Sequence, residues 1–227
     1  MNRCINAFLT PRVAASLLIS REITFSEPFS SDMCRSIFSE LKKMSIQELL
    51  QIIDCHHYGL IADVKYIPQF GKISTVIKVP DYFAKHSHIC ADYAQLGFYL
   101  KQDVHASLEA NIKFGENHGK TAALLGIINC NKSRFEPSVF TSFFSNLTPE
   151  DKEQIIFKLL FRIPIIQILL NQAKDHPFNG YSPMNHLSKS TRQRRAANIK
   201  AILNHLKSFN DDDLIRRINN IYWKEDE

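Results

Sequence analysis

The chain contains little glycine and proline, which restricts the classes of fold that it can adopt. Only 7 Gly and 9 Pro occur in 227 residues. A collagen-like or low-complexity disordered chain needs far more of both, and a turn-rich all-β protein needs more glycine. Hydrophobic residues make up 44% of the sequence and include 16 Phe, which is ample for a packed core. We therefore expect a folded, mainly α protein with a small β content (α+β).

Long apolar runs are also missing, which argues against a membrane protein. The most apolar segment, residues 155–170, is interrupted by Lys158, Arg162 and Pro164. It is shorter than the roughly 20 residues that a bilayer span needs. The run 14–19 is too short for a secretion signal and lacks a cleavage site. The sequence predicts a soluble, cytoplasmic protein without membrane contact.

Paired cysteines and the common cofactor motifs are absent as well. The 5 cysteines are scattered and never form C-x-x-C, so reduced thiols of a cytosolic protein are the expected state. Cys55-His56-His57 resembles part of a metal site, but no second ligand pair stands at zinc spacing. A glycine-rich phosphate loop, G-x-S-x-G and H-E-x-x-H are missing too. No cofactor is therefore expected.

Acidic residues are missing from residues 182–207, where basic residues are concentrated. The segment contains six of them, Lys189, Arg192, Arg194, Arg195, Lys200 and Lys207. The whole chain has a formal net charge of only +5. Because the basic excess is local, this segment is the best candidate for binding a polyanion such as nucleic acid.

The basic segment also has the pattern of a helix that follows a short helix and a turn. Ser190 and Gln193 form a capping-box pattern at its start. One apolar stripe then follows at helical spacing: Ala196, Ile199, Ile202, Leu203 and Leu206. A short helix fits before it, with Pro183 at its first position and Ser188-Lys189 as the turn. This is the layout of a helix-turn-helix, whose second helix enters a DNA groove. The alternative is a solvated surface helix, although such helices usually carry both signs of charge.

Residues 1–80 are expected to form a small α/β region that serves dimerisation or partner contacts. Helices are predicted over 11–19, 31–43 and 45–53. Ser45 and Glu48 form a capping box at the start of the third. The segments 59–67 and 71–79 are rich in β-branched and aromatic residues, and they predict two paired strands, the second ended by Pro80.

Two further regions are expected, over residues 81–148 and 149–227. In the first, one helix is predicted over 88–100. A second helix starts from a cap at Asp103 or Ser107 and is interrupted at Phe114-Gly115, and a third is predicted over 116–125. The segments 127–128 and 134–140 then predict two short strands, a wing. The last region begins with a helical spacer, with helix starts at Thr148-Pro149 and at Pro164, and ends with a helix over 211–222.

Two segments resemble bacterial winged-helix modules. The segment 116–128, Glu-Asn-His-Gly-Lys-Thr-Ala-Ala-Leu-Leu-Gly-Ile-Ile, is similar to the end of a recognition helix that leads into a wing. The segment 187–203, with Ser-Thr-Arg-Gln-Arg-Arg-Ala-Ala at its centre, is similar to the helix of a second module. Tandem winged-helix pairs occur in the DNA-recognition parts of restriction endonucleases and in bacterial regulators. The resemblance covers roughly residues 88–207 and implies tandem winged-helix/helix-turn-helix modules.

Both segments contain side chains that suit double-stranded DNA. In the second, the candidates for base edges are Arg192, Gln193 and Arg194. The candidates for phosphates there are Lys189, Ser190, Thr191, Arg195 and Lys200. In the first segment the exposed candidates are Lys113, Asn117, His118 and Lys120. For Asn117 and His118, capping or packing is the alternative.

A Mg²⁺-dependent restriction-type endonuclease is the first alternative function. Such enzymes pair an Asp with a later (Asp/Glu)-x-Lys on a strand, and Asp54 with Asp63-Val-Lys65 matches this pattern. An Asp-x-Lys also occurs on ordinary half-buried strands, where Val64 would point inward.

We expect a binding protein rather than an enzyme. The predicted function is sequence-specific binding of double-stranded DNA, as a bacterial regulator or as the recognition subunit of a defence system, and a homodimer is compatible with it. The second alternative is a protein-interaction module whose winged helices bind protein.

Overall fold

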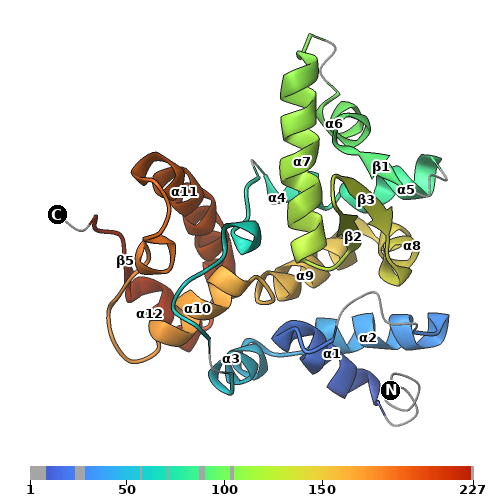
Figure 1. Ribbon diagram of the computed structural model, residues 1–227. Helices are drawn as coiled ribbons and strands as arrows, with labels where there is room; N and C mark the ends of the chain where they lie inside the picture. The colour runs from blue at the N-terminus through green and yellow to red at the C-terminus, as the bar shows by residue number, and fades with distance from the viewer. Residues whose placement is uncertain are drawn as a thin grey trace. The chain divides into compact units, whose positions relative to one another are not determined.

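The computed structural model describes residues 9–23, 29–56, 58–70, 72–86, 90–102 and 105–225. The chain forms two compact units. Unit 1 comprises Met1–Lys43 and Gln69–Ile156, and unit 2 comprises Met44–Pro68 and Phe157–Glu227. Helices dominate both units and the strands are short (Figure 1). The expectation of a mainly helical α+β protein is therefore confirmed.

Unit 1 combines helices with one small antiparallel sheet. Its helices are α1 (Pro11–Ser20), α2 (Ser31–Lys43), α4 (Ile73–Val76), α5 (Val79–His86), α6 (Tyr93–Lys101), α7 (Leu108–Leu124), α8 (Val139–Ser145) and the first part of α9 (Pro149–Leu160). Its strands are β1 (Ala91–Asp92), β2 (Ile128–Asn131) and β3 (Arg134–Pro137), in the order β1-β3-β2. The β2–β3 hairpin after α7 confirms the two predicted short strands, but the second ends at Pro137 and not at residue 140, because Ser138 caps α8.

Unit 2 is built on helices and one pair of two-residue strands. Its helices are α3 (Ile46–Asp54), the end of α9, α10 (Pro164–Gln172), α11 (Lys189–Leu206) and α12 (Asp212–Asn219). Single 3₁₀ turns are η2 (Val64–Tyr66), η3 (Ser182–Met184) and η4 (Lys207–Phe209). The strands β4 (Phe178–Asn179) and β5 (Ile221–Tyr222) pair in parallel.

Local capping signals fix several helix starts where the sequence predicts them. Ser45 accepts a hydrogen bond from the backbone N–H of Glu48, and the Glu48 carboxylate accepts one from Ser45 N at 2.7 Å. Ser107 caps α7 in the same way through Ala110 N. The starts of α9 and α10 carry Pro149 and Pro164, whose missing N–H costs nothing in a first helical turn.

The two predicted strands over 59–67 and 71–79 are wrong. The first segment contains η2, because the Asp63 carboxylate accepts a hydrogen bond from Lys65 N at 3.0 Å and closes a turn. Ala62 N–H donates to the carbonyl of Pro183 at 2.9 Å instead of to a partner strand. The second segment forms α4 and the start of α5, with Pro80 in the first turn of α5. In the first segment the local turn at Asp63 and the distant hydrogen bond to Pro183 thus replace the strand pairing that the β-branched composition favours.

The predicted interruption at Phe114-Gly115 is also wrong, because α7 is continuous. Its glycines allow close packing instead of breaking the helix. A Cβ atom on Gly115 would lie 2.0 Å from the carbonyl oxygen of Tyr93, and one on Gly97 would lie 1.9 Å from that of Asn111. A Cβ on Gly119 would lie 2.2 Å from the ring of Phe135. The backbones of α6 and α7 therefore touch where they cross (Figure 1).

Replacing Gly97 with alanine tests this close packing. We expect Gly97→Ala to lower the free energy of unfolding of unit 1 by about 1–3 kcal/mol, because a backbone carbonyl already occupies the position of the new methyl group. The measurement is urea unfolding followed by far-UV circular dichroism.

Gly59→Ala, in unit 2, is the control for the loss of a glycine alone, since among the described residues beyond its chain neighbours no heavy atom lies within 4 Å of a Cβ at Gly59. Both substitutions reduce the conformational entropy of the unfolded chain equally. Equal unfolding midpoints for the two variants would contradict the proposed contact between α6 and α7.

Candidate nucleic-acid interface

The start of α11 differs from the prediction by two residues. Ser188 is the cap, with extended backbone angles, and its hydroxyl accepts a hydrogen bond from Thr191 N at 3.4 Å. The predicted capping box at Ser190 and Gln193 is therefore wrong, since Ser190 already lies in the first turn. The short helix expected before α11 is the single turn η3, with Pro183 at its start. The shift places Lys189 at the first helical position.

The predicted apolar stripe of α11 is confirmed. Its five residues are all buried: Ala196, Ile199, Ile202, Leu203 and Leu206. At the front of the helix, Lys189, Ser190, Gln193 and Arg194 are exposed. Only 3% of the surface of Leu203 is exposed, whereas Arg194 faces solvent. The rotation of α11 about its axis is thus the one that the sequence pattern predicts.

Two cations of α11 are available to a ligand without rearrangement. Lys189 and Arg194 are exposed, and among the described residues neither side chain forms an ion pair. Lys189 also lies in the first turn, whose backbone N–H groups favour anions. Lys189 and Arg194 are therefore the strongest candidates for contact with phosphate or a base edge.

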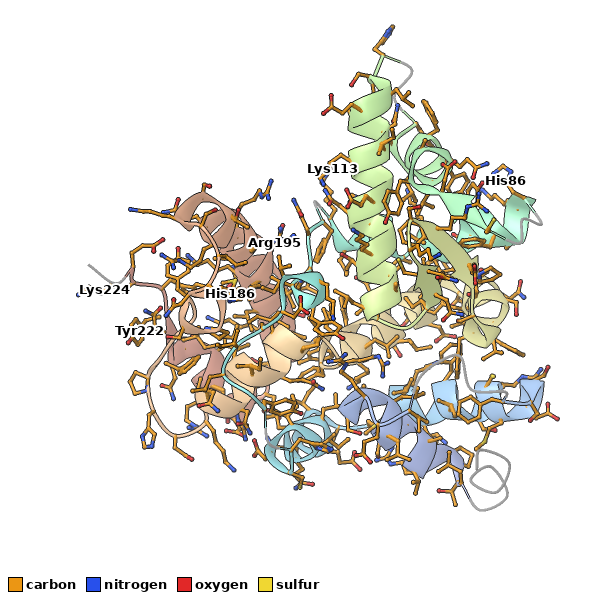
Figure 2. The ribbon with its side chains drawn as sticks, viewed as in Figure 1. His86, Lys113, His186, Arg195, Tyr222 and Lys224 are labelled. Atoms are coloured by element: carbon orange, nitrogen blue, oxygen red, sulfur yellow. The ribbon has the colours of Figure 1, made fainter. Side chains whose placement is uncertain are left out.

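Apart from the exposed Ser190, the other predicted contact residues of α11 form contacts within unit 2. Arg192 forms an ion pair with Glu225, and the amide of Gln193 donates to the same carboxylate at 3.3 Å. The guanidinium of Arg195, which is labelled in Figure 2, donates to the carbonyl of Ile67 at 2.8 Å. The Lys200 ammonium lies 4.9 Å from the centre of the Trp223 ring, and the hydroxyl of Thr191 accepts from Ser188 at 3.0 Å.

The lysines of α7 are largely neutralised. Lys113, which Figure 2 labels on α7, and Lys120 each lie 2.7 Å from the carboxylate of Glu116. Burial alone would raise the pKa of Glu116, but the hydrogen bonds from both lysines outweigh it and lower that pKa. Asn117, beside Glu116, is half-buried. The exposed face of α7 is therefore a weaker attractor of phosphate than the start of α11.

His118 is a packing residue, and the prediction that it is exposed is wrong. Only 2% of its area is exposed, and its ring lies 4.1 Å from the ring of Phe114. Nδ1 lies 2.8 Å from the carbonyl oxygen of Phe114, and burial lowers the pKa of the imidazole. The helical spacing of Asn111, Gly115, His118 and Ala122 marks one buried face. The assumed break at Gly115 hid this pattern.

The β2–β3 hairpin presents two basic side chains that the sequence analysis did not single out. Lys132 and Arg134 are exposed at its tip, where Lys132 has a left-handed backbone with φ 54°. The hydroxyl of Tyr93 donates to the carbonyl of Lys132 at 3.3 Å and steadies the turn. The segment from Asn129 to Arg134 contains no acid, which is the signal that could have identified it.

Asp54, Asp63 and Lys65 do not form the strand-borne metal motif that the nuclease alternative requires. Asp54 binds the guanidinium of Arg217 with two contacts of 2.6 and 2.9 Å and the ammonium of Lys174 at 2.9 Å. Asp63 and Lys65 are exposed and pair with each other at 3.0 Å. Within the described part of the chain, no group of three His, Cys, Asp or Glu residues is placed to hold a metal ion. Asp54 is therefore best explained as an ion-pair partner.

The comparisons with known proteins add no relative. No family model, curated protein or solved structure matches the chain. Among the described residues, no helix is both long enough and apolar enough to span a bilayer.

Removing the Asp54 carboxylate tests its structural role. The side chain of Arg217 is only 3% exposed, and among the described residues Asp54→Asn leaves it with Asp213 as its sole carboxylate partner. We expect the free energy of unfolding of unit 2 to fall by about 3 kcal/mol. Trp223 is the single tryptophan and lies in unit 2, so its fluorescence follows this transition.

Asp63→Asn is the control, because that carboxylate pairs with Lys65 in solvent, and it should leave the transition unchanged.

The dependence of unfolding on acid pH is a second measurement of the role of Asp54. Hydrogen bonds from basic groups hold the pKa of Asp54 and of Asp213 below the usual value, although burial alone would raise both. Their contribution is present above about pH 4 and is lost as the pH falls through the lower folded-state values. An Asp54→Asn variant as acid-sensitive as the wild type would contradict this role.

Proposed function

We propose that the chain binds double-stranded DNA, with the start of α11 as the principal contact. The observation that carries the proposal is the combination of a buried apolar stripe at the rear of α11 with exposed Lys189 and Arg194 at its front. No acid occurs between residues 182 and 207 to neutralise them locally. A helix anchored in this way can present its first turns to a groove, where arginine donors read base edges.

The topology of unit 1 supports a winged-helix module as part of the same proposal. Its elements follow in the order α5, β1, α6, α7, β2, β3, with the strands arranged β1-β3-β2. This order resembles a winged helix, in which a hairpin follows the recognition helix. The exposed Lys132 and Arg134 at the hairpin tip would then contact the DNA backbone. With the α11 region as a second module, the chain would act as a cytoplasmic regulator or as a recognition subunit of a defence system.

Alanine substitutions at the front of α11 test the DNA proposal. We expect Arg194→Ala to weaken binding of a selected site by about 1–3 kcal/mol and to relax the preference at one base pair. Lys189→Ala should weaken all duplexes similarly and reduce the salt dependence, because one phosphate contact is lost. Fluorescence anisotropy with a selected duplex and with random duplexes, over a series of salt concentrations, measures both effects.

Arg35→Ala is the matched control, since this guanidinium on α2 is 75% exposed and its loss changes the net charge equally. A Lys189→Ala/Arg194→Ala double variant that binds DNA as tightly as the Arg35→Ala protein would exclude α11 as the contact surface.

Protein contact through α6 and α7 is a second candidate function. Phe98, Leu108 and Ile112 are 54%, 59% and 36% exposed. Phe98 and Ile112 are the chain neighbours of Gly97 and Asn111, whose backbones touch, so both residues lie near the crossing of α6 and α7. Adjacent exposed apolar residues mark interaction surfaces. We propose that they bind a second copy of the chain.

A charge placed in this apolar patch tests self-association. Leu108→Glu should convert a dimer to a monomer in size-exclusion chromatography with light scattering, because the glutamate would have to be buried without a partner. Val13→Glu on α1 is the control, since Val13 is 47% exposed and lies on a different helix. A monomeric wild-type chain at high concentration would contradict the second candidate.

A further inference from the structure

The segment from Ile221 to Glu225 is held against unit 2 by backbone contacts. β5 pairs with β4, and Gly180 N–H donates to the carbonyl of Tyr222 at 2.8 Å. The side-chain amide of Asn179 donates to the carbonyl of Lys224 at 2.7 Å. Figure 2 labels Tyr222 and Lys224 on this segment. Its course is therefore fixed independently of the charged side chains that it carries.

Trp223 anchors the same segment. The ring fits over Gly180, where a Cβ atom would lie 2.7 Å from the indole. It also meets the Tyr181 ring edge-on, with 5.3 Å between the ring centres. In addition, the centre of the Trp223 ring lies 4.9 Å from the ammonium of Lys200, a residue of α11. The anchor thus brings the residues that follow Trp223 to the basic helix.

Glu225 then occupies the donors of α11 that the sequence assigns to DNA. Its carboxylate pairs with the guanidinium of Arg192 and accepts a hydrogen bond from Gln193 at 3.3 Å. The guanidinium also lies 5.6 Å from the centre of the Tyr181 ring. As a result the Arg192 side chain is only 15% exposed, whereas Arg194, two residues later on another face of the helix, faces solvent.

A carboxylate and a phosphate make the same charge-assisted hydrogen bonds to a guanidinium. We propose that Glu225 is a built-in competitor of DNA: it imitates a backbone phosphate on Arg192 and Gln193, and DNA must displace it to use the whole front of α11. This inference rests on the proposed DNA binding. Asp226 and Glu227, which follow in the sequence, carry the same sign of charge. The arrangement is an autoinhibitory contact within unit 2.

Glu225→Gln tests the competition. We expect this variant to bind duplex DNA about fivefold more tightly than the wild type, because Arg192 no longer has to leave an ion pair. The slope of log affinity against log salt should steepen by about 0.9, the value for one added phosphate contact. In an Arg192→Ala background the same substitution should give a smaller gain, since only the Gln193 amide remains to be released.

Asp175→Asn is the matched control, because Asp175 is an exposed acid of unit 2 and its loss changes the net charge equally. Thermal unfolding followed by circular dichroism shows whether each variant keeps its fold. If Glu225→Gln and Asp175→Asn bind DNA equally, Glu225 is not a competitor, while the DNA proposal stands. If neither the wild type nor Glu225→Gln binds DNA at low salt, the DNA proposal fails as well. Binding by Glu225→Gln alone would support both.

Discussion

The buried guanidinium of Arg217 is the constraint on which unit 2 depends. A buried positive charge is stable only when negative groups pair with it. The carboxylates of Asp54 on α3 and Asp213 on α12 pair with Arg217. Burial alone would lower the pKa of Arg217, but these hydrogen bonds raise it, so the charge persists at every accessible pH. A further hydrogen bond of 3.4 Å reaches the carbonyl of Leu170 on α10. One side chain thus joins three helices that are distant in the sequence.

This junction also determines what α11 offers to a ligand. α12 follows α11 and leads directly into β5, so the helix that Arg217 fixes also sets the start of the segment that carries Trp223 and Glu225. The front of α11 is consequently divided. Lys189 and Arg194 face solvent, whereas Arg192 and Gln193 are bound by Glu225. A plain basic helix would present all of its donors at once.

The features that the sequence predicts correctly are those set by neighbours along the chain. The capping box at Ser45 and the buried stripe of α11 need only a few adjacent residues, so their patterns are sufficient. The segment 59–67 is different, because Ala62 bonds to Pro183, far away in the chain. The same holds for the candidate site: the exposure of Arg194 follows from helix rotation, whereas the capture of Arg192 depends on Glu225, 33 residues later.

The touching backbones of α6 and α7 have a consequence for the evolution of this chain. At Gly97 and Gly115 the space of a side chain is already filled by a carbonyl group of the other helix, and at Gly119 by an aromatic ring. At Gly97 and Gly115 even a methyl group requires one helix to move away from the other, and at Gly119 it requires the ring of Phe135 to shift. The spacing of the three glycines is therefore a fingerprint of the helix pair, and it would persist in distant descendants after the surrounding sequence has diverged.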